Sequence, residues 1–345
     1  MTNTPRRMVI LTDGYGDSHA AKTAICVTRY IPDEVVAILD THSAGKTAGE
    51  VLGVGGSIPV VGRLADAHGA NTLLIGIAPA GGKLPTQWNP IVLDAIRRRM
   101  TVVSGLHDLL KHNAEFTAAA EEHGSELVDL RDNDESDVAS GEPFRTECLR
   151  IHTIANDCSV GKMVAAVELT EGLRRAGVDA QFVATGQTGM LIAGSGCAVD
   201  RVLSDFVAGA AERLVRANEH HEVVVVEGQG SLFHPRYSGV TLSLLHGVQP
   251  DGMVLVYEMG RPTIHGMERF PLPPLRRVVE YYEQTAAILH PSRVIGVAIN
   301  GRRYSDAELD AECARVEADL GVPACDVIRH GPAKLVDAVR RMRTG

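Results

Sequence analysis

Short runs of aliphatic and β-branched residues alternate along the chain with longer segments of helical periodicity. In the first third, such runs predict strands at 8–12, 34–40, 59–62, 72–77, 101–104 and 127–130. This alternation is typical of βαβ units, in which helices connect parallel strands. We therefore expect an α/β fold with a mostly parallel sheet in this part of the chain.

The alternation stops at residues 131–142, which are acidic and lack a hydrophobic period, as is typical of a linker. It then resumes, with strands expected at 149–154, 179–183, 222–227, 252–256 and 294–299. The helical patterns cover 162–176, 199–218, 275–289, 306–320 and 333–342. A length of 345 residues also suits about two domains. We expect a first domain at 1–132, a linker at 133–146 and a second domain at 147–345.

Composition narrows the class of partner. Lys and Arg number 34 against 43 Asp and Glu, and the net charge of −9 disfavours binding to nucleic acid or to anionic membranes. The six cysteines lack metal-ligand spacing, so we expect free thiols and no metal site. No signal-peptide core or membrane-spanning apolar run is present in the sequence. We expect a cytoplasmic protein that binds small molecules and forms a homo-oligomer.

The most informative stretch follows the predicted strand at 149–154. It ends in Gly161-Lys162, directly before a predicted helix. In a P-loop, backbone N–H groups and a helix N-terminus converge on phosphate, and the lysine adds positive charge. A helix that merely starts after a strand is the simpler alternative. The phosphate interpretation makes these residues candidates for cofactor binding: Asn156, Asp157, Cys158, Ser159, Val160, Gly161, Lys162 and Met163.

The loop departs from the strict pattern G-x-x-x-x-G-K-[ST] at two positions. Asn156 stands where the first glycine belongs, and Met163 replaces the hydroxyl residue. That hydroxyl ordinarily ligates Mg²⁺, on which phosphoryl transfer depends. The sequence therefore favours a phosphate-bearing cofactor that is bound but not hydrolysed, such as coenzyme A. ATP with Mg²⁺ is the alternative.

A thiol in such a loop has two possible roles. At a helix N-terminus Cys158 could become a nucleophile that carries an acyl group. A small buried residue is the commoner role for cysteine. The sequence leaves both open.

Polar residues also follow other predicted strands. Four consecutive valines end in Glu227, and Gln229 and His234 follow. Ligands of open α/β sheets bind at the carboxyl ends of such central strands. Glu227 could bind a metal, accept a proton from a substrate amine, cap a turn or pair with Lys162. His234 could be catalytic or merely exposed.

Further candidates for substrate contact are polar residues in glycine-containing loops and single charged residues. Asp205, near the start of a predicted helix, could recognise an amine or cap the helix. Arg261 could bind a carboxylate or form a surface ion pair. The full set of substrate-binding candidates is Thr185, Gln187, Thr188, Gln229, Ser231 and Arg261.

Two weaker motifs occur in the first domain. Gly14-x-Gly16-x-x-His19 imitates a dinucleotide-binding fingerprint without its third glycine. Gly45-Lys46-Thr47 lacks the upstream part of a phosphate loop. Neither favours a ligand as strongly as the loop at Lys162 does.

The chain resembles a two-domain family long catalogued as a domain of unknown function, some members of which are assigned as D-glutamate N-acetyltransferases. In the N-terminal half the resemblance rests on DTHSAGKTAGEVLG, IGIAPAGGKLPTQW and VVSGLHDLL. In the C-terminal half it rests on NDCSVGKM, FVATGQTGMLIAG, SDFVAGAAE, VVVEGQGSLFHPRYSGVTLSLLHG and GVAIN. The sequence departs from the family loop at Ala155 and Asn156, where Gly-Thr is usual.

The C-terminal half is also similar, more distantly, to dethiobiotin synthetase-like P-loop enzymes. That likeness implies one nucleotide-type cleft lined by the phosphate loop, Glu227 and a base-contacting Asn300. The two resemblances together imply an N-terminal Rossmann-like domain and a C-terminal P-loop NTPase-like domain, each with a parallel sheet.

The resemblance implies acetyl transfer from acetyl-CoA to the amino group of D-glutamate or a related D-amino acid. The amine must lose a proton to attack a thioester, so a carboxylate or histidine should accept it. The catalytic candidates are Glu227, His234 and Asp205. The alternatives are an ATP-dependent kinase or ligase of the dethiobiotin synthetase type, and a nucleotide-sensing protein without turnover.

Overall fold

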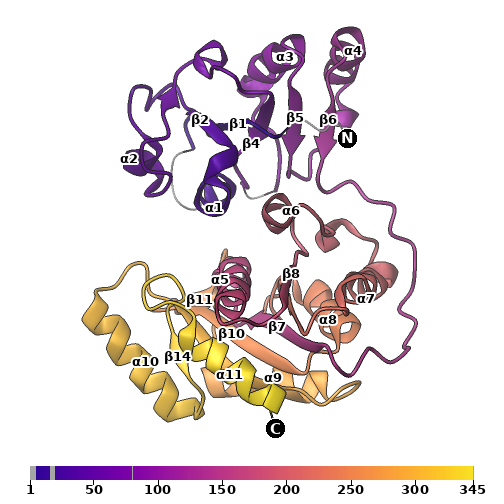
Figure 1. The fold of residues 1–345 in the computed structure, drawn as a ribbon, viewed down its shortest axis with the longest axis vertical. Helices are drawn as coiled ribbons and strands as arrows, with labels where there is room; N and C mark the ends of the chain where they lie inside the picture. Colours follow the sequence, from indigo (N-terminus) through magenta and orange to yellow (C-terminus); the bar gives the residue numbers. More distant parts are fainter. Residues whose placement is uncertain (1–4, 16–19, 80, 345) are drawn as a thin grey trace. The chain divides into compact units, whose positions relative to one another are not determined.

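The computed structural model describes residues 5–15, 20–79 and 81–344. It divides into two compact units, which Figure 1 colours from indigo to yellow along the chain. The first unit comprises Met1–Asn133 and Met190–Gly194, and the second comprises Asp134–Gly189 and Ser195–Gly345. Each unit is built around its own parallel sheet.

The first unit has a six-stranded sheet in the order β3-β2-β1-β4-β5-β6. Its strands are β1 (Met8–Leu11), β2 (Val35–Leu39), β3 (Val60–Val61), β4 (Thr72–Ile75), β5 (Thr101–Ser104) and β6 (Leu127–Asp129). The helices are α1 (Lys22–Tyr30), α2 (Ala48–Leu52), α3 (Asn89–Arg97) and α4 (Ala114–His123). Alternate residues of β1 enter two different hydrophobic clusters, because successive side chains point to opposite faces of the sheet. All the strands predicted for this unit are confirmed.

The second unit has a six-stranded sheet in the order β14-β13-β10-β7-β9-β8. Its strands are β7 (Leu149–Ala155), β8 (Ala180–Val183), β9 (Val223–Val226), β10 (Gly252–Glu258), β13 (Arg293–Asn300) and β14 (Ala324–Cys325). A small antiparallel hairpin adds β11 (Thr263–Ile264) and β12 (Met267–Pro271). The helices are α5 (Lys162–Arg175), α7 (Val207–Asn218), α8 (Ser238–Val248), α9 (Leu275–Ala286), α10 (Asp306–Leu320) and α11 (Ala333–Thr344). A further helix, α6 (Gln187–Ala193), begins in this unit, and its residues from Met190 on belong to the first unit.

Strand order places the candidate residues along one edge of this sheet. β7 lies between β10 and β9, and all these strands run parallel, so their carboxyl ends meet at the same edge. The valines of β9 are fully buried, as expected for a central strand covered on both faces. Glu227 follows them directly, and the loop that follows β7 lies one strand away.

Two helical predictions were wrong in detail. The helix expected at 199–218 begins only at Val207, after two short 3-10 turns at Val199–Arg201 and Ser204–Phe206. Residues 187–193 were expected to be a loop, because glycines flank and interrupt them, but they form α6. The two residues before it, Thr185 and Gly186, hydrogen-bond to a distant side chain, described below.

The structure also bears on the weaker motifs and on the linker. Thr47 caps α2 through a reciprocal capping box with Glu50, so its hydroxyl is used structurally. Gly16 and His19 of the fingerprint lie outside the described residues. The segment at 133–146 has no helix or strand, and its Ser140 hydrogen-bonds to Glu212 of α7. None of the described helices has the length and hydrophobicity needed to span a membrane.

Candidate functional site

The loop between β7 and α5 has the backbone of an anion-binding turn. Gly161 has φ 115°, in a region that side-chain-bearing residues rarely adopt, and Ser159 has φ 55°. Among the residues that the structure describes, no side chain caps the N-terminus of α5. The first helical hydrogen bond runs from Ala165 N–H to the Gly161 carbonyl, at 2.9 Å.

Consecutive N–H groups of this loop are unused. Within the described part of the chain, the backbone N–H groups of residues 159–164 have no hydrogen-bond acceptor. N–H groups at the start of a helix normally need a capping group, water or a ligand. Several of them converging on one point, with the positive end of the helix dipole, form a binding site for an anion.

Lys162 lies against this loop with its ammonium group buried. Its side chain is 7% exposed, and Nζ donates to the carbonyl oxygens of Gly230 (2.7 Å) and Asp157 (3.2 Å). Burial lowers the pKa of Lys162 to about 8, although nearby acidic groups oppose the shift. Gly228 makes room for this arrangement, because a Cβ there would lie 1.7 Å from the Thr153 carbonyl oxygen and 3.0 Å from Cδ of Lys162.

Glu227 is buried beside the start of α6. Its Oε2 accepts the backbone N–H groups of Thr185 and Gly186, both at 3.1 Å, and its Oε1 accepts Nε2 of Gln229 at 3.0 Å. Burial raises the pKa of Glu227 to about 7, while these hydrogen bonds and Lys162 lower it. The turn-capping role is therefore observed, and Gln229 is the one hydrogen-bond donor to Oε1 among the described residues.

Arg261 ties the loop to the hairpin of β11 and β12. Its Nη1 donates to Oδ2 of the buried Asp157 (2.7 Å) and to the Cys158 carbonyl (2.8 Å). Its Nε donates to Oε2 of Glu258 at 2.9 Å. The same Asp157 oxygen accepts the backbone N–H of His265 at 2.8 Å. Because two carboxylates already balance Arg261, its role in binding a substrate carboxylate stays a prediction.

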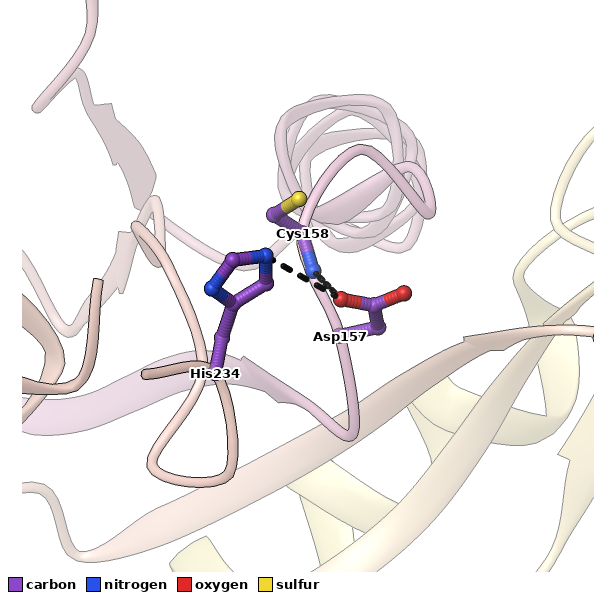
Figure 2. A group of neighbouring side chains, drawn as sticks. All are labelled: Asp157, Cys158 and His234. Carbon is purple, nitrogen blue, oxygen red and sulfur yellow. Dashed lines mark hydrogen bonds and ion pairs between the residues drawn. The ribbon is translucent and has the colours of Figure 1, made fainter. Parts of the chain in front are cut away.

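Figure 2 shows the imidazole of His234 facing Asp157, with Cys158 beside them. His234 Nδ1 accepts the backbone N–H of Arg236 (3.2 Å), and Nε2 lies 3.3 Å from the His265 carbonyl and 4.0 Å from Oδ1 of Asp157. An acceptor at Nδ1 assigns the proton of the neutral ring to Nε2. His234 is therefore arranged as a hydrogen-bond donor rather than as a base.

The same three side chains bring potential metal-ligand atoms within 4.8 Å of one another. The surroundings disfavour a cation, however. One oxygen of Asp157 already accepts a backbone N–H, and the other accepts Arg261 and His265. A metal would also need Nε2 of His234 to lose its proton. The cluster is better suited to fixing the loop.

The remaining candidates divide between the loop and its surroundings. Asn300 Nδ2 donates to the Val160 carbonyl at 3.1 Å, so the end of β13 contacts the loop. Oδ1 of the buried Asn156 has no partner among the described residues. Ser231 is buried, and its hydroxyl accepts the Phe233 N–H.

The residues around Glu227 position it. Thr185 Oγ1 donates to the backbone carbonyl of Glu227 at 2.7 Å, and Gln229 contacts both residues. Gln187 donates to the Thr188 hydroxyl at 2.7 Å, in the first turn of α6. Asp205 is exposed on a 3-10 turn, and within the described part of the chain no hydrogen bond connects it with the residues around Glu227.

Sequence reasoning missed Glu258, Arg302 and Arg303. β10 extends to Glu258, two residues beyond its predicted end, and Glu258 pairs in register with Asn300. The rule that flagged Glu227, an acid at the carboxyl end of a buried strand, would also have flagged Glu258 had the strand been predicted to its true end.

Comparison with known proteins agrees with this architecture. The model of a P-loop domain of unknown function, DUF1611, matches residues 137–336, and that of its Rossmann-like N-terminal domain matches residues 41–133. A protein of Tritonibacter scottomollicae named D-glutamate N-acetyltransferase is 36% identical over 94% of this chain and 95% of its own length. A protein of the same name from Pseudoalteromonas is 37% identical over 78% of this chain and 81% of its own length.

A solved structure is also similar over nearly the whole chain. The crystal structure of a DUF1611 family protein from Anabaena variabilis covers 97% of this chain and 99% of its own, with 33% identity and a TM-score of 0.91. The predicted pairing of a Rossmann-like N-terminal domain with a P-loop C-terminal domain is confirmed. This chain is therefore a member of the DUF1611 family.

Proposed function

We propose that the protein is an N-acetyltransferase, which moves the acetyl group of acetyl-CoA to the amino group of D-glutamate or a related D-amino acid. The names of the two curated relatives support this reaction. The observation in this chain that carries it is the row of unused N–H groups at residues 159–164 beside Lys162. This arrangement suits the diphosphate of coenzyme A.

The absence of a hydroxyl after Lys162 separates this proposal from nucleotide hydrolysis. Met163 stands at the position whose oxygen ordinarily ligates Mg²⁺. A loop that holds phosphate without recruiting the metal can anchor a cofactor and leave its phosphates intact.

Strand order supports a direction for the cofactor in this proposal. The loop follows β7, with Glu227 on the β9 side and Asn300 on the β10 and β13 side. The pantetheine arm separates the thioester from the diphosphate. We place the arm on the β9 side, where Glu227 can meet the acetyl group, and the adenosine on the β13 side.

Glu227 is the proton acceptor in this proposal. The amine nitrogen attacks the thioester carbonyl, its proton passes to Oε1 of Glu227, and the carbon–sulfur bond breaks to release the CoA thiolate. A base whose pKa is about 7 suits work near neutral pH. Thr185 and Gln229 position it. Residues 185–189 are proposed to contact the amino acid.

The decisive test is incubation with acetyl-CoA and a panel of D- and L-amino acids, with free thiol and acetylated product both measured. We expect product with D-glutamate or a close relative. Phosphate release from ATP, coupled to an amine or carboxylate substrate and dependent on Mg²⁺, would instead identify a kinase or ligase. Tight nucleotide binding without any acetylated product would identify a sensing protein.

A Lys162→Met variant tests the phosphate role separately. Loss of a charged hydrogen bond to phosphate should weaken CoA binding by roughly ten- to hundred-fold, measured by calorimetry. Lys334→Met is the matched control, because Lys334 pairs with Glu317 on the surface of the same unit. Unchanged CoA affinity in Lys162→Met would contradict the proposed cradle.

A further inference from the structure

An arginine-rich rim lies beside the loop, at the carboxyl ends of β10 and β13. Arg302 Nη2 lies 3.2 Å from Oε1 of Glu258, and Arg303 Nε lies 3.7 Å from the same oxygen. Arg261 contacts the other Glu258 oxygen and also pairs with Asp157. We call Arg302 and Arg303 the arginine pair.

In this rim, three guanidinium groups contact two carboxylates. Glu258 is buried, which raises its pKa, but the adjacent arginines hold that pKa below its usual range, so the group is ionised at neutral pH. The guanidinium groups of Arg261, Arg302 and Arg303 thus face two carboxylates, Glu258 and Asp157. Among the described residues Arg303 makes only the 3.7 Å contact with Glu258, so it is the least neutralised of the three guanidinium groups.

The guanidinium groups of the arginine pair are accessible to solvent. The side chain of Arg302 is 37% exposed and that of Arg303 is 72% exposed, whereas Glu258 is only 4% exposed. The buried carboxylate of Glu258 thus contacts the arginine pair on its protein side. The N–H donors on the solvent side of the pair can bind a ligand. A guanidinium offers several donors in a planar fork that matches phosphate oxygens.

The segment that carries the arginine pair is firmly held next to the loop. Arg329 Nη1 donates to the carbonyl oxygens of Gly301 (3.3 Å) and Tyr304 (2.8 Å). Asn300, immediately before this segment, contacts the Val160 carbonyl of the loop. The arginine pair is thus fixed on the side of the loop where the proposed direction of the cofactor puts adenosine.

We infer that the arginine pair binds the 3′-phosphate on the ribose of coenzyme A. This inference rests on the proposed function, because it needs the diphosphate on the loop. A phosphate carries a charge of about −1.5 to −2 at neutral pH, and its oxygens suit the N–H donors of two exposed guanidinium groups. ATP and dephospho-CoA lack this phosphate, so the arginine pair selects for coenzyme A against both.

The test compares acetyl-CoA with acetyl-3′-dephospho-CoA as donors. For the natural protein, we expect kcat/KM to favour acetyl-CoA by roughly ten- to hundred-fold, the usual effect of charge-assisted hydrogen bonds. An Arg302→Ala/Arg303→Ala variant should lose this preference but keep its activity with the dephospho donor. Arg174→Ala is the matched control, because Arg174 pairs with Glu171 about 18 Å along α5 from the loop.

The outcomes separate the inference from the proposed function. Equal use of both donors by the natural protein would overturn the 3′-phosphate site while acetyl transfer stands. No transfer from either donor would overturn the proposed function itself. If the double variant does not fold, inhibition of the natural protein supplies the same test: adenosine 3′,5′-bisphosphate should compete with acetyl-CoA more strongly than AMP, and equal inhibition would refute the site.

Discussion

Lys162 and Glu227 are two buried groups whose ordinary charges are partly suppressed by their surroundings. Burial lowers the pKa of Lys162 to about 8 and raises that of Glu227 to about 7. Each would titrate far from neutrality if it were exposed to water. In this protein a modest change of pH alters both the cation proposed to hold phosphate and the proposed base.

The shifted pKa values of Lys162 and Glu227 predict a bell-shaped pH dependence of kcat/KM for acetyl-CoA. Activity should rise with pH through about 7, because Glu227 must lose its proton before it can accept one from the amine. It should fall as pH rises through about 8, because Lys162 then loses the charge that attracts phosphate. Steady-state rates across the range that brackets both values would show the two limbs.

Glu227→Gln should lower kcat by about a hundred-fold or more and remove the rising limb of that profile. The falling limb should remain, since Lys162 is unchanged. Glu171→Gln, at an exposed ion pair on α5, is the control and should keep both limbs. A Glu227→Gln profile that still rises through the same pH range would exclude Glu227 as the base.

Cys158 is predicted to take no covalent part in the transfer. Burial and the charge of Asp157 raise the pKa of its thiol, so the reactive thiolate is scarce. If the loop holds the diphosphate, the pantetheine arm also carries the thioester away from this residue.

Cys158→Ala should keep kcat within about two-fold, a margin typical of a residue outside the reaction. Intact-protein mass spectrometry after mixing with acetyl-CoA alone should show no acetylated enzyme; an acetyl group on Cys158 would establish the covalent route.

At the scale of elements, strands were the best predicted features. Val223–Val226 is apolar throughout because both faces of β9 are covered, so its pattern needs no knowledge of its neighbours. The end of β10 was not predictable in this way. Tyr257 and Glu258 continue the strand because they pair with Ile299 and Asn300, and that register is a property of the sheet.

At the site, too, features set by the local sequence were predicted, and features set by distant contacts were not. The loop at 156–163 and Glu227 were found because each follows a strand directly in sequence. α6 was missed because its glycines favour a loop, whereas its start is held by the carboxylate of Glu227, some forty residues away. The pairing of Arg261 with Asp157 was missed for the same reason, since the two residues lie 104 positions apart.

The contact between α6 and Glu227 requires glycine at position 189. A Cβ there would lie 2.4 Å from Oε2 of Glu227. Gly189→Ala should therefore displace the carboxylate and lower kcat by about ten-fold or more, since small misplacements of catalytic groups have large effects. CoA affinity should change little. Gly239→Ala on α8 is the matched control, because nothing lies within 4 Å of its added methyl group; an unaltered kcat in Gly189→Ala would show that the position of Glu227 is unimportant.

At the scale of the whole molecule, the two units have separate hydrophobic clusters and separate sheets. The only tryptophan, Trp88, is fully buried in a cluster of the first unit. Its fluorescence therefore reports unfolding of the first unit, whereas far-ultraviolet circular dichroism reports helices in both. The proposed cofactor site belongs to the second unit alone.

Acetyl-CoA should therefore stabilise the molecule unevenly. A ligand at a hundred times its Kd stabilises the unit that binds it by about 2.7 kcal/mol, which raises the unfolding midpoint by several degrees. In thermal scans with acetyl-CoA, the circular dichroism transition of the second unit should move up, while the Trp88 fluorescence transition stays in place. Lys162→Met, at the same acetyl-CoA concentration, should reduce the shift to about half or less. A Trp88 midpoint that rose together with the dichroism signal would contradict the prediction that binding stabilises the second unit alone.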